Sequence, residues 1–141
     1  SALTLKTTGD AKALLESAIR KSMADVRALA LGTSEASKIA TFEASKGIVW
    51  ADEVNKYVAK IMANYDAATT DAEKMNIIAN EYWAAAHGNG IEIFNLYRRT
   101  GFPSNPQPAL DPNPGQFVRS FFYPTAFIVR NSNAKQKANV T

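Results

Sequence analysis

The sequence predicts a mostly α-helical fold built from antiparallel helix pairs, with a long proline-rich loop and an extended C-terminal segment. Apolar residues recur at helical spacing in several stretches, and capping residues mark the ends of these stretches. Four further prolines follow Pro103 before Gly115, and proline disfavours helix interiors and central strands. The 141 residues are 46% hydrophobic and 21% charged. This composition is typical of globular proteins, so residues 1–141 are expected to form a single unit.

The first predicted helix begins after Asp10 and ends at Gly32. Asp10 is a favourable N-cap and Gly32 a favourable stop. Between them, apolar side chains recur on one face, at Leu15, Ile19, Met23, Val26 and Ala30. The pattern is then lost among small and polar residues up to Ala51. The short apolar group at residues 48–50 predicts that this stretch is a loop that touches the core.

The next two helices are predicted to form an antiparallel pair, from Asp52 to about Ala68 and from Thr70 to about His87. Thr70 and Glu73 have the T-x-x-E spacing of a capping box. The pair has about the 34-residue length of a tetratricopeptide unit, although it does not match the tetratricopeptide consensus. The apolar faces are predicted to hold Val54, Tyr57, Val58, Ile61, Met62 and Tyr65 in one helix, and Met75, Ile78, Tyr82, Trp83 and Ala86 in the other.

A short helix with a cap at each end is predicted directly after this pair. Gly88 suits the left-handed end of the preceding helix, Asn89 is an N-cap, and Glu92 stands at the capping-box position. Gly101 and Pro103 stop the helix. Its apolar residues lie on most of its circumference, so we expect it to be covered on several sides: Ile91, Ile93, Phe94, Leu96 and Tyr97.

The C-terminal part differs from the rest in composition. Residues 117–130 are rich in β-branched and aromatic side chains, which predicts a strand or an extended packed segment interrupted at Pro124. Residues 131–141 are expected to be a solvated end. After Asp111 the chain carries basic residues and no acid, whereas lysines, arginines and acids alternate through most of the rest. No nucleic-acid-binding module accompanies this charge, so no nucleic-acid partner is expected.

The residues predict no catalytic, metal or cofactor site. Without cysteine, thiolate metal sites, disulfides and cysteine nucleophiles are excluded. His87, the single histidine, lies at a predicted helix end, where a structural role is favoured. Glu81 and Glu92 are the candidates for the carboxylate pair of a glycosidase, but each has a simpler role at a helix surface or cap. No apolar run is long enough to span a bilayer.

Trp50 is the candidate ligand-binding residue. Sugar rings present apolar C–H faces that stack on tryptophan and tyrosine, while their hydroxyls seek amides and arginine. The alternative is that Trp50 and Trp83 fill the core, since tryptophan is highly buried on average.

The run IIANEYWAAAHGNGIEIFNLYRRTGFP, residues 77–103, resembles the C-terminal region of the SusD/RagB family of outer-membrane nutrient-binding lipoproteins. The family pattern reads roughly I-x-x-Q-x-W, then G-N-G-x-E-x-W-N-x-x-R-R-T-G-Y-P. Residues 17–23 (SAIRKSM) are similar to the family's G-I-R-A-S-M, and residues 119–131 to R-R-x-x-Y-P-x-x-E-x-x-x-N. Matching positions are Trp83, Gly88, Asn89, Gly90, Glu92, Asn95, Arg98, Arg99, Thr100, Gly101, Pro103, Arg119, Tyr123, Pro124 and Asn131.

Departures from the family pattern indicate a divergent branch. Phe94 stands where the family has tryptophan, Glu81 where it has glutamine, Ser120 where it has arginine and Phe127 where it has glutamate. By the same resemblance, the arginines at positions 98, 99 and 119 are structural residues that pair with carboxylates or carbonyls.

The resemblance implies a non-catalytic, surface-exposed and lipid-anchored helical protein of the outer membrane. Such proteins capture an oligosaccharide or other nutrient and hand it to a TonB-dependent, SusC-like outer-membrane transporter. Because family members are several times longer, residues 1–141 are expected to be a C-terminal portion. Membrane contact is then expected only through a lipid anchor outside them. The alternative is a helical protein–protein interaction module without a small-molecule site of its own.

Overall fold

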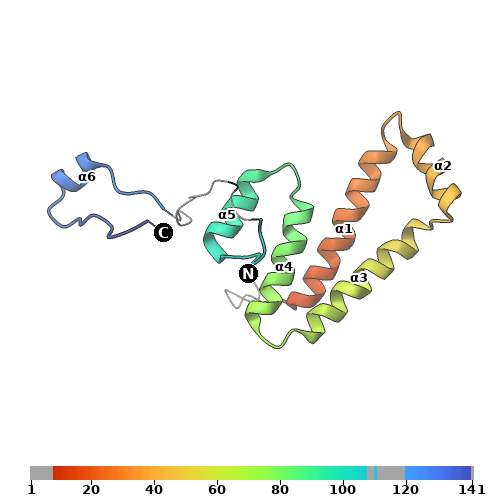
Figure 1. The fold of residues 1–141 in the computed structure, drawn as a ribbon, viewed down its shortest axis with the longest axis horizontal. Helices are drawn as coiled ribbons and strands as arrows, with labels where there is room; N and C mark the ends of the chain where they lie inside the picture. Colours follow the sequence, from red (N-terminus) through yellow and green to blue (C-terminus); the bar gives the residue numbers. More distant parts are fainter. Residues whose placement is uncertain (1–7, 108–109, 111–119, 141) are drawn as a thin grey trace.

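The computed structural model describes residues 8–107, 110 and 120–140, and its fold is mostly α-helical, as predicted (Figure 1). No strand occurs in these residues. The helices are α1 (Ala11–Leu31), α2 (Ala36–Lys46), α3 (Trp50–Ala67), α4 (Asp71–Ala85), α5 (Gly90–Thr100) and α6 (Thr125–Arg130).

Helices α1 and α3 pack side by side in opposite directions. Near the start of α1, the Lys12 ammonium lies 2.7 Å from the Asp66 carboxylate at the end of α3. About two turns further along α1, Arg20 donates a 2.9 Å hydrogen bond to Asn55, which lies earlier in α3. Residue numbers therefore increase along α1 in the direction in which they decrease along α3, so the two helices are antiparallel.

The predicted antiparallel pair of α3 and α4 is confirmed. Tyr57 on α3 donates to Glu81 on α4, and the Lys74 ammonium lies over the Tyr65 ring at 5.6 Å from its centroid. Because α4 also contacts α1, the three helices form one packed group. Since α1 and α4 each run opposite to α3, they run parallel to each other.

The core lies mainly between α1 and α3. It contains Leu15 and Ile19 from α1, as predicted, and Val58, Met62 and Tyr65 from the predicted face of α3. The predicted face of α4 is wrong in detail, because Ala79 is its buried residue and Tyr82 is exposed. In α4, Ile77 and Ile78 are partly buried against the core cluster, whereas Tyr82 lines the groove.

The predicted loop between residues 32 and 51 is wrong, because its middle forms helix α2. No residue of α2 is buried, so the helix has no apolar stripe that periodicity can detect. Gly47 ends it in the left-handed conformation, with φ of 63°. Trp50, predicted to lie in this loop, is instead the first residue of α3.

The predicted helix caps around α4 and α5 are confirmed. Thr70 and Glu73 form both hydrogen bonds of the capping box. Gly88 has φ of 87°, which only glycine adopts without strain. The Asn89 side chain accepts from the Glu92 amide at 3.3 Å, and Gly101 ends α5 in the left-handed conformation.

The expectation that α5 is covered on several sides is wrong. Leu96 is buried, and Ile93 and Tyr97 are half-buried, but Ile91 is 75% exposed and Phe94 is half exposed. Among the described elements, α5 packs mainly against α4. Ile91 therefore faces solvent.

The C-terminal residues fold back on themselves. The Ser120 amide donates to the Val140 carbonyl at 3.2 Å, and the Gln136 side chain bonds both the amide and the carbonyl of Tyr123 at 2.9 Å. The strand prediction is wrong for residues 125–130, which form α6. Figure 1 shows α6 apart from α1–α5. Arg119 and much of the proline-rich loop lie outside the described residues.

Candidate ligand groove

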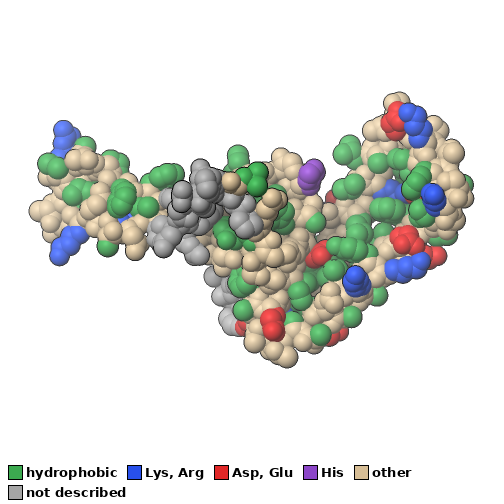
Figure 2. Space-filling view, in the orientation of Figure 1, with side chains coloured by type: hydrophobic (Ala, Val, Ile, Leu, Met, Phe, Trp, Pro, Cys, Tyr) green, Lys and Arg blue, Asp and Glu red, His purple; other side chains and the backbone are tan. Residues whose placement is uncertain are grey.

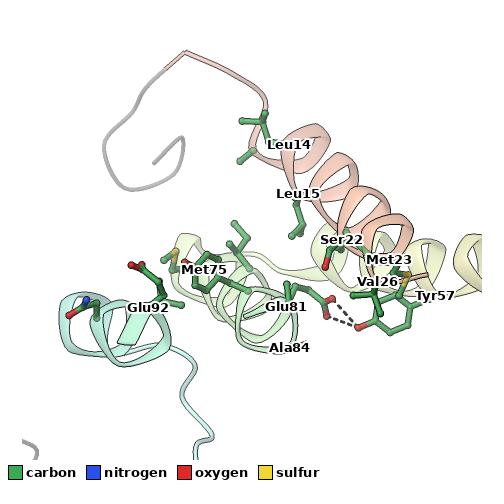
Figure 3. A pocket seen from close by; sticks show the side chains of 18 of the residues that line it. Leu14, Leu15, Ser22, Met23, Val26, Tyr57, Met75, Glu81, Ala84 and Glu92 are labelled. Carbon is green, nitrogen blue, oxygen red and sulfur yellow. Dashed lines mark hydrogen bonds between the residues drawn. The ribbon is translucent and has the colours of Figure 1, made fainter. Parts of the chain in front are cut away.

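A groove of about 920 Å³ lies between α1, α4 and α5 (Figure 3). Its walls are mainly apolar, with Leu14 and Val26 on α1 and Met75 and Ile78 on α4. Helix α3 contributes Trp50 and Tyr57. Figure 2 shows hydrophobic side chains exposed around the hollow formed by these helices.

One part of the groove, formed by Met23, Val26, Trp50, Tyr57 and Glu81, combines aromatic and charged side chains; we call it the aromatic end. Figure 3 shows Tyr57 and Glu81 pointing toward one another there. The Tyr57 hydroxyl lies 3.1 and 2.9 Å from the two Glu81 carboxylate oxygens. The pairing of Tyr57 with Glu81 was not predicted, because the two residues lie on different helices and no sequence motif joins them.

The Tyr57 hydroxyl remains protonated at physiological pH. Burial, together with its hydrogen bond to Glu81, raises the pKa of Tyr57 to about 12. The phenol therefore acts as a hydrogen-bond donor to the carboxylate. Since an ionised carboxylate has about four acceptor positions, Glu81 retains capacity to accept from a ligand hydroxyl.

Trp50, the predicted ligand-binding residue, lies between two cavities. It lines the groove and also a second cavity of about 390 Å³ that includes Val54 and Lys60. The Arg27 guanidinium lies 4.8 Å from the centroid of the Trp50 ring. It also forms a bidentate ion pair with Glu43, in which one of the two hydrogen bonds is 2.9 Å long. The guanidinium covers part of the indole, so a ligand has to approach Trp50 from elsewhere.

The Arg27–Glu43 ion pair predicts a specific pH dependence of stability. Hydrogen bonds from Arg27 hold the pKa of Glu43 below its ordinary value of 4.5. A carboxylate whose pKa is lowered by folding stabilises the folded state at pH values above its unfolded-state pKa. This contribution is lost as the pH falls through the folded-state pKa. We expect Glu43→Gln to lower the urea midpoint at pH 7, with the difference from the unsubstituted protein shrinking as the pH falls below 4.5. A difference that is the same at pH 7 and pH 3 would contradict this role.

The family-like motif residues divide into two groups. Glu92, Asn95, Arg98 and Arg99 line the groove from α5. The others shape helix ends or packing: Gly88, Asn89, Gly90 and Gly101 lie at the ends of α4 and α5, Pro103 is buried, and Trp83 contacts Tyr97 edge-on with ring centroids 6.4 Å apart. Tyr123 and Pro124 lie in the C-terminal residues, apart from both groups.

Glu81 and Glu92 both line the groove, but Glu81 has a structural partner in Tyr57, and Glu92 follows the cap of α5. Within the described part of the chain, no three acidic or histidine side chains gather closely enough to hold a metal ion. In the same residues, none of the helices combines the length and the apolar character needed to cross a membrane.

Comparison with known proteins places the chain in a family. The model of the SusD-like family, described as SusD and RagB outer membrane lipoproteins, matches residues 2–141. No curated protein and no solved structure matches the chain. Since the match covers nearly all of the sequence and agrees with the helical fold and with the motif at residues 77–103, the chain belongs to the SusD-like family.

Proposed function

We propose that the chain takes part in non-catalytic nutrient binding at the bacterial cell surface, with an oligosaccharide as ligand and a TonB-dependent outer-membrane transporter as the recipient. The family's description as outer membrane lipoproteins supports this location. Residues 1–141 would be the C-terminal portion of a longer protein, held at the membrane by a lipid anchor outside them.

The aromatic end of the groove is the observation that supports an oligosaccharide ligand most directly. Trp50 and Tyr57 present aromatic surface beside the Glu81 carboxylate. A sugar ring offers the complementary chemistry, because its C–H face packs on an aromatic ring while its hydroxyls donate to a carboxylate. Mainly apolar walls with a few polar groups are typical of ligand-binding clefts.

Titration with oligosaccharides tests this proposal. We expect at least one of maltoheptaose, cellohexaose, xylohexaose and mannohexaose to release heat and to quench tryptophan fluorescence. Trp50→Ala should remove most of the quenching and weaken binding about tenfold or more, which corresponds to about 1.4 kcal/mol. Trp83→Phe is the matched control, because Trp83 does not line the groove; its binding heat should be unchanged.

The absence of heat with every sugar in the panel would contradict an oligosaccharide ligand. A Trp50→Ala variant that binds a sugar as tightly as the unsubstituted chain would contradict the placement of the ligand at the aromatic end.

A protein-interaction module is the second candidate function. Its support is the mainly apolar wall of the groove together with the exposed Ile91 and Phe94 on α5. An amphipathic helix of another polypeptide is the kind of ligand that such grooves accept. In this case calorimetry should give heat with the purified transporter and none with the sugars.

A further inference from the structure

The C-terminal residues expose an unusual amount of apolar surface. We call residues 120–130 the aromatic segment. Phe121 is 81% and Val129 is 77% exposed, while Phe122 and Phe127 are each about half exposed. These large apolar side chains occur within nine residues, and monomeric proteins rarely expose large contiguous apolar patches. Figure 2 shows hydrophobic atoms over this end of the molecule as well as around the groove.

The groove leaves a complementary set of apolar side chains open. Leu14 and Val26 on α1 are both more than half exposed, and Tyr82 on α4 is also exposed. The same chain therefore carries a projecting apolar segment and an apolar hollow. Burial of one against the other would remove both from water.

The chain that leads to the aromatic segment starts beside the groove. After α5, Pro103 is buried and the Ser104 amide donates a 2.8 Å hydrogen bond to the Asn76 side chain on α4. Asn76 follows Met75, which lines the groove. Residues 108–119 are twelve in number and span up to about 40 Å when extended. This reach exceeds the length of about 32 Å of the 21-residue helix α1, the longest wall of the groove.

The charges of the two parts are opposite in sign. Residues 120–140 contain Arg130, Lys135 and Lys137 and no acid, whereas residues 8–107 contain twelve acidic and eleven basic residues. Within the groove the charges are balanced, because Glu81 and Glu92 line it together with Arg98 and Arg99. The match between the segment and the groove is therefore one of apolar surfaces.

The aromatic segment is already ordered by its own contacts. The Tyr123 and Phe127 rings lie 5.5 Å apart between centroids, and the Lys137 ammonium lies 4.8 Å from the Tyr123 ring centroid. The Gln136 side chain accepts a hydrogen bond from the Tyr123 amide and donates one to the Tyr123 carbonyl. A segment that is ordered in advance loses less conformational entropy when it docks.

We propose that the aromatic segment docks into the groove of its own molecule, with Phe121, Phe122 and Phe127 packed between α1 and α4. This arrangement is a second state of the chain, in addition to the one in which the segment lies apart. It does not rest on the proposed nutrient binding, because no ligand takes part in it.

Disulfide cross-linking tests the docked state. Because the chain has no native cysteine, each variant contains only the two introduced cysteines. Ser22 lines the groove and Ser17 lies on the exposed outer surface of the same helix. Each is changed to cysteine in combination with Ala126→Cys, which leaves the aromatic residues intact. Because a disulfide requires Cα atoms within about 7 Å, we expect S22C/A126C to form an intramolecular disulfide at about tenfold higher yield than S17C/A126C. Adding Phe121→Ser, Phe122→Ser and Phe127→Ser should reduce the yield to that of the control.

Two cross-linking outcomes overturn the proposal. Equal yields from both pairs would show that the segment has no preference for the groove. A disulfide-linked dimer as the main S22C/A126C product would show that a second copy occupies the groove instead.

Methionine oxidation gives an independent measurement should the cysteine variants lose helical circular dichroism. Met23 and Met75 line the groove, whereas Met62 is buried in the core and serves as internal reference. Docking predicts that the three serine substitutions, without cysteines, raise the peroxide oxidation rates of Met23 and Met75 several-fold relative to Met62. Unchanged ratios in the helical variant would reject the docked state.

Discussion

Ile19→Ala is expected to lower the free energy of unfolding by about 2–5 kcal/mol. Ile19 is 5% exposed and packs in the core cluster between α1 and α3. Its truncation removes buried apolar surface and leaves a cavity that the surrounding helices fill only in part. Urea unfolding followed by circular dichroism at 222 nm measures the change.

Leu29→Ala is the matched control for Ile19→Ala. Leu29 lies on the same helix but is 75% exposed, and substitutions at such positions usually change stability by less than about 0.5 kcal/mol. Equal losses from the two variants would mean that α1 is not held by the core described above. A larger loss from Leu29→Ala would indicate that this exposed surface is covered in solution.

Ala79→Leu is expected to lower the free energy of unfolding by about 1–3 kcal/mol. Ala79 is fully buried on α4, so the larger side chain has to displace its neighbours. Forcing extra methylene groups into a packed site moves side chains away from their preferred rotamers. The measurement is thermal or urea unfolding of the full chain.

Ala72→Leu is the control for Ala79→Leu. Ala72 lies on the same helix and is exposed, and alanine and leucine differ little in helix propensity. This variant should unfold at nearly the same urea concentration as the unsubstituted protein. An Ala79→Leu variant as stable as Ala72→Leu would contradict the close packing of α4.

Helices with an apolar stripe or a cap were predictable from the sequence. Asp10 and Thr70 each supply a side-chain oxygen to a helix start, and Gly101 supplies the left-handed end of α5. These are interactions between residues within a few positions of one another, so the local sequence contains all the information. Helix α2 was missed for the converse reason, since it buries no side chain and its first residue follows a Glu35 that makes no side-chain cap.

The candidate site was predictable only in its components. Trp50 is a ligand candidate by residue type, but no pattern along the chain indicates that Arg27 lies over its ring. Tyr57 and Glu81 were assigned to separate helix surfaces, and their hydrogen bond depends on how α3 and α4 pack. Contacts between helices depend on crossing geometry and register, which no spacing along the chain specifies.

The sequence by itself determined the main helices, their caps and, through the motif at residues 77–103, the SusD-like family. The tertiary structure decided which faces are buried. It placed Ala79 inside and left Ile91 and Phe94 outside, and it opened the groove between α1, α4 and α5. The physical reason is that helix formation and capping satisfy backbone groups locally, whereas burial depends on which surfaces other parts of the chain cover.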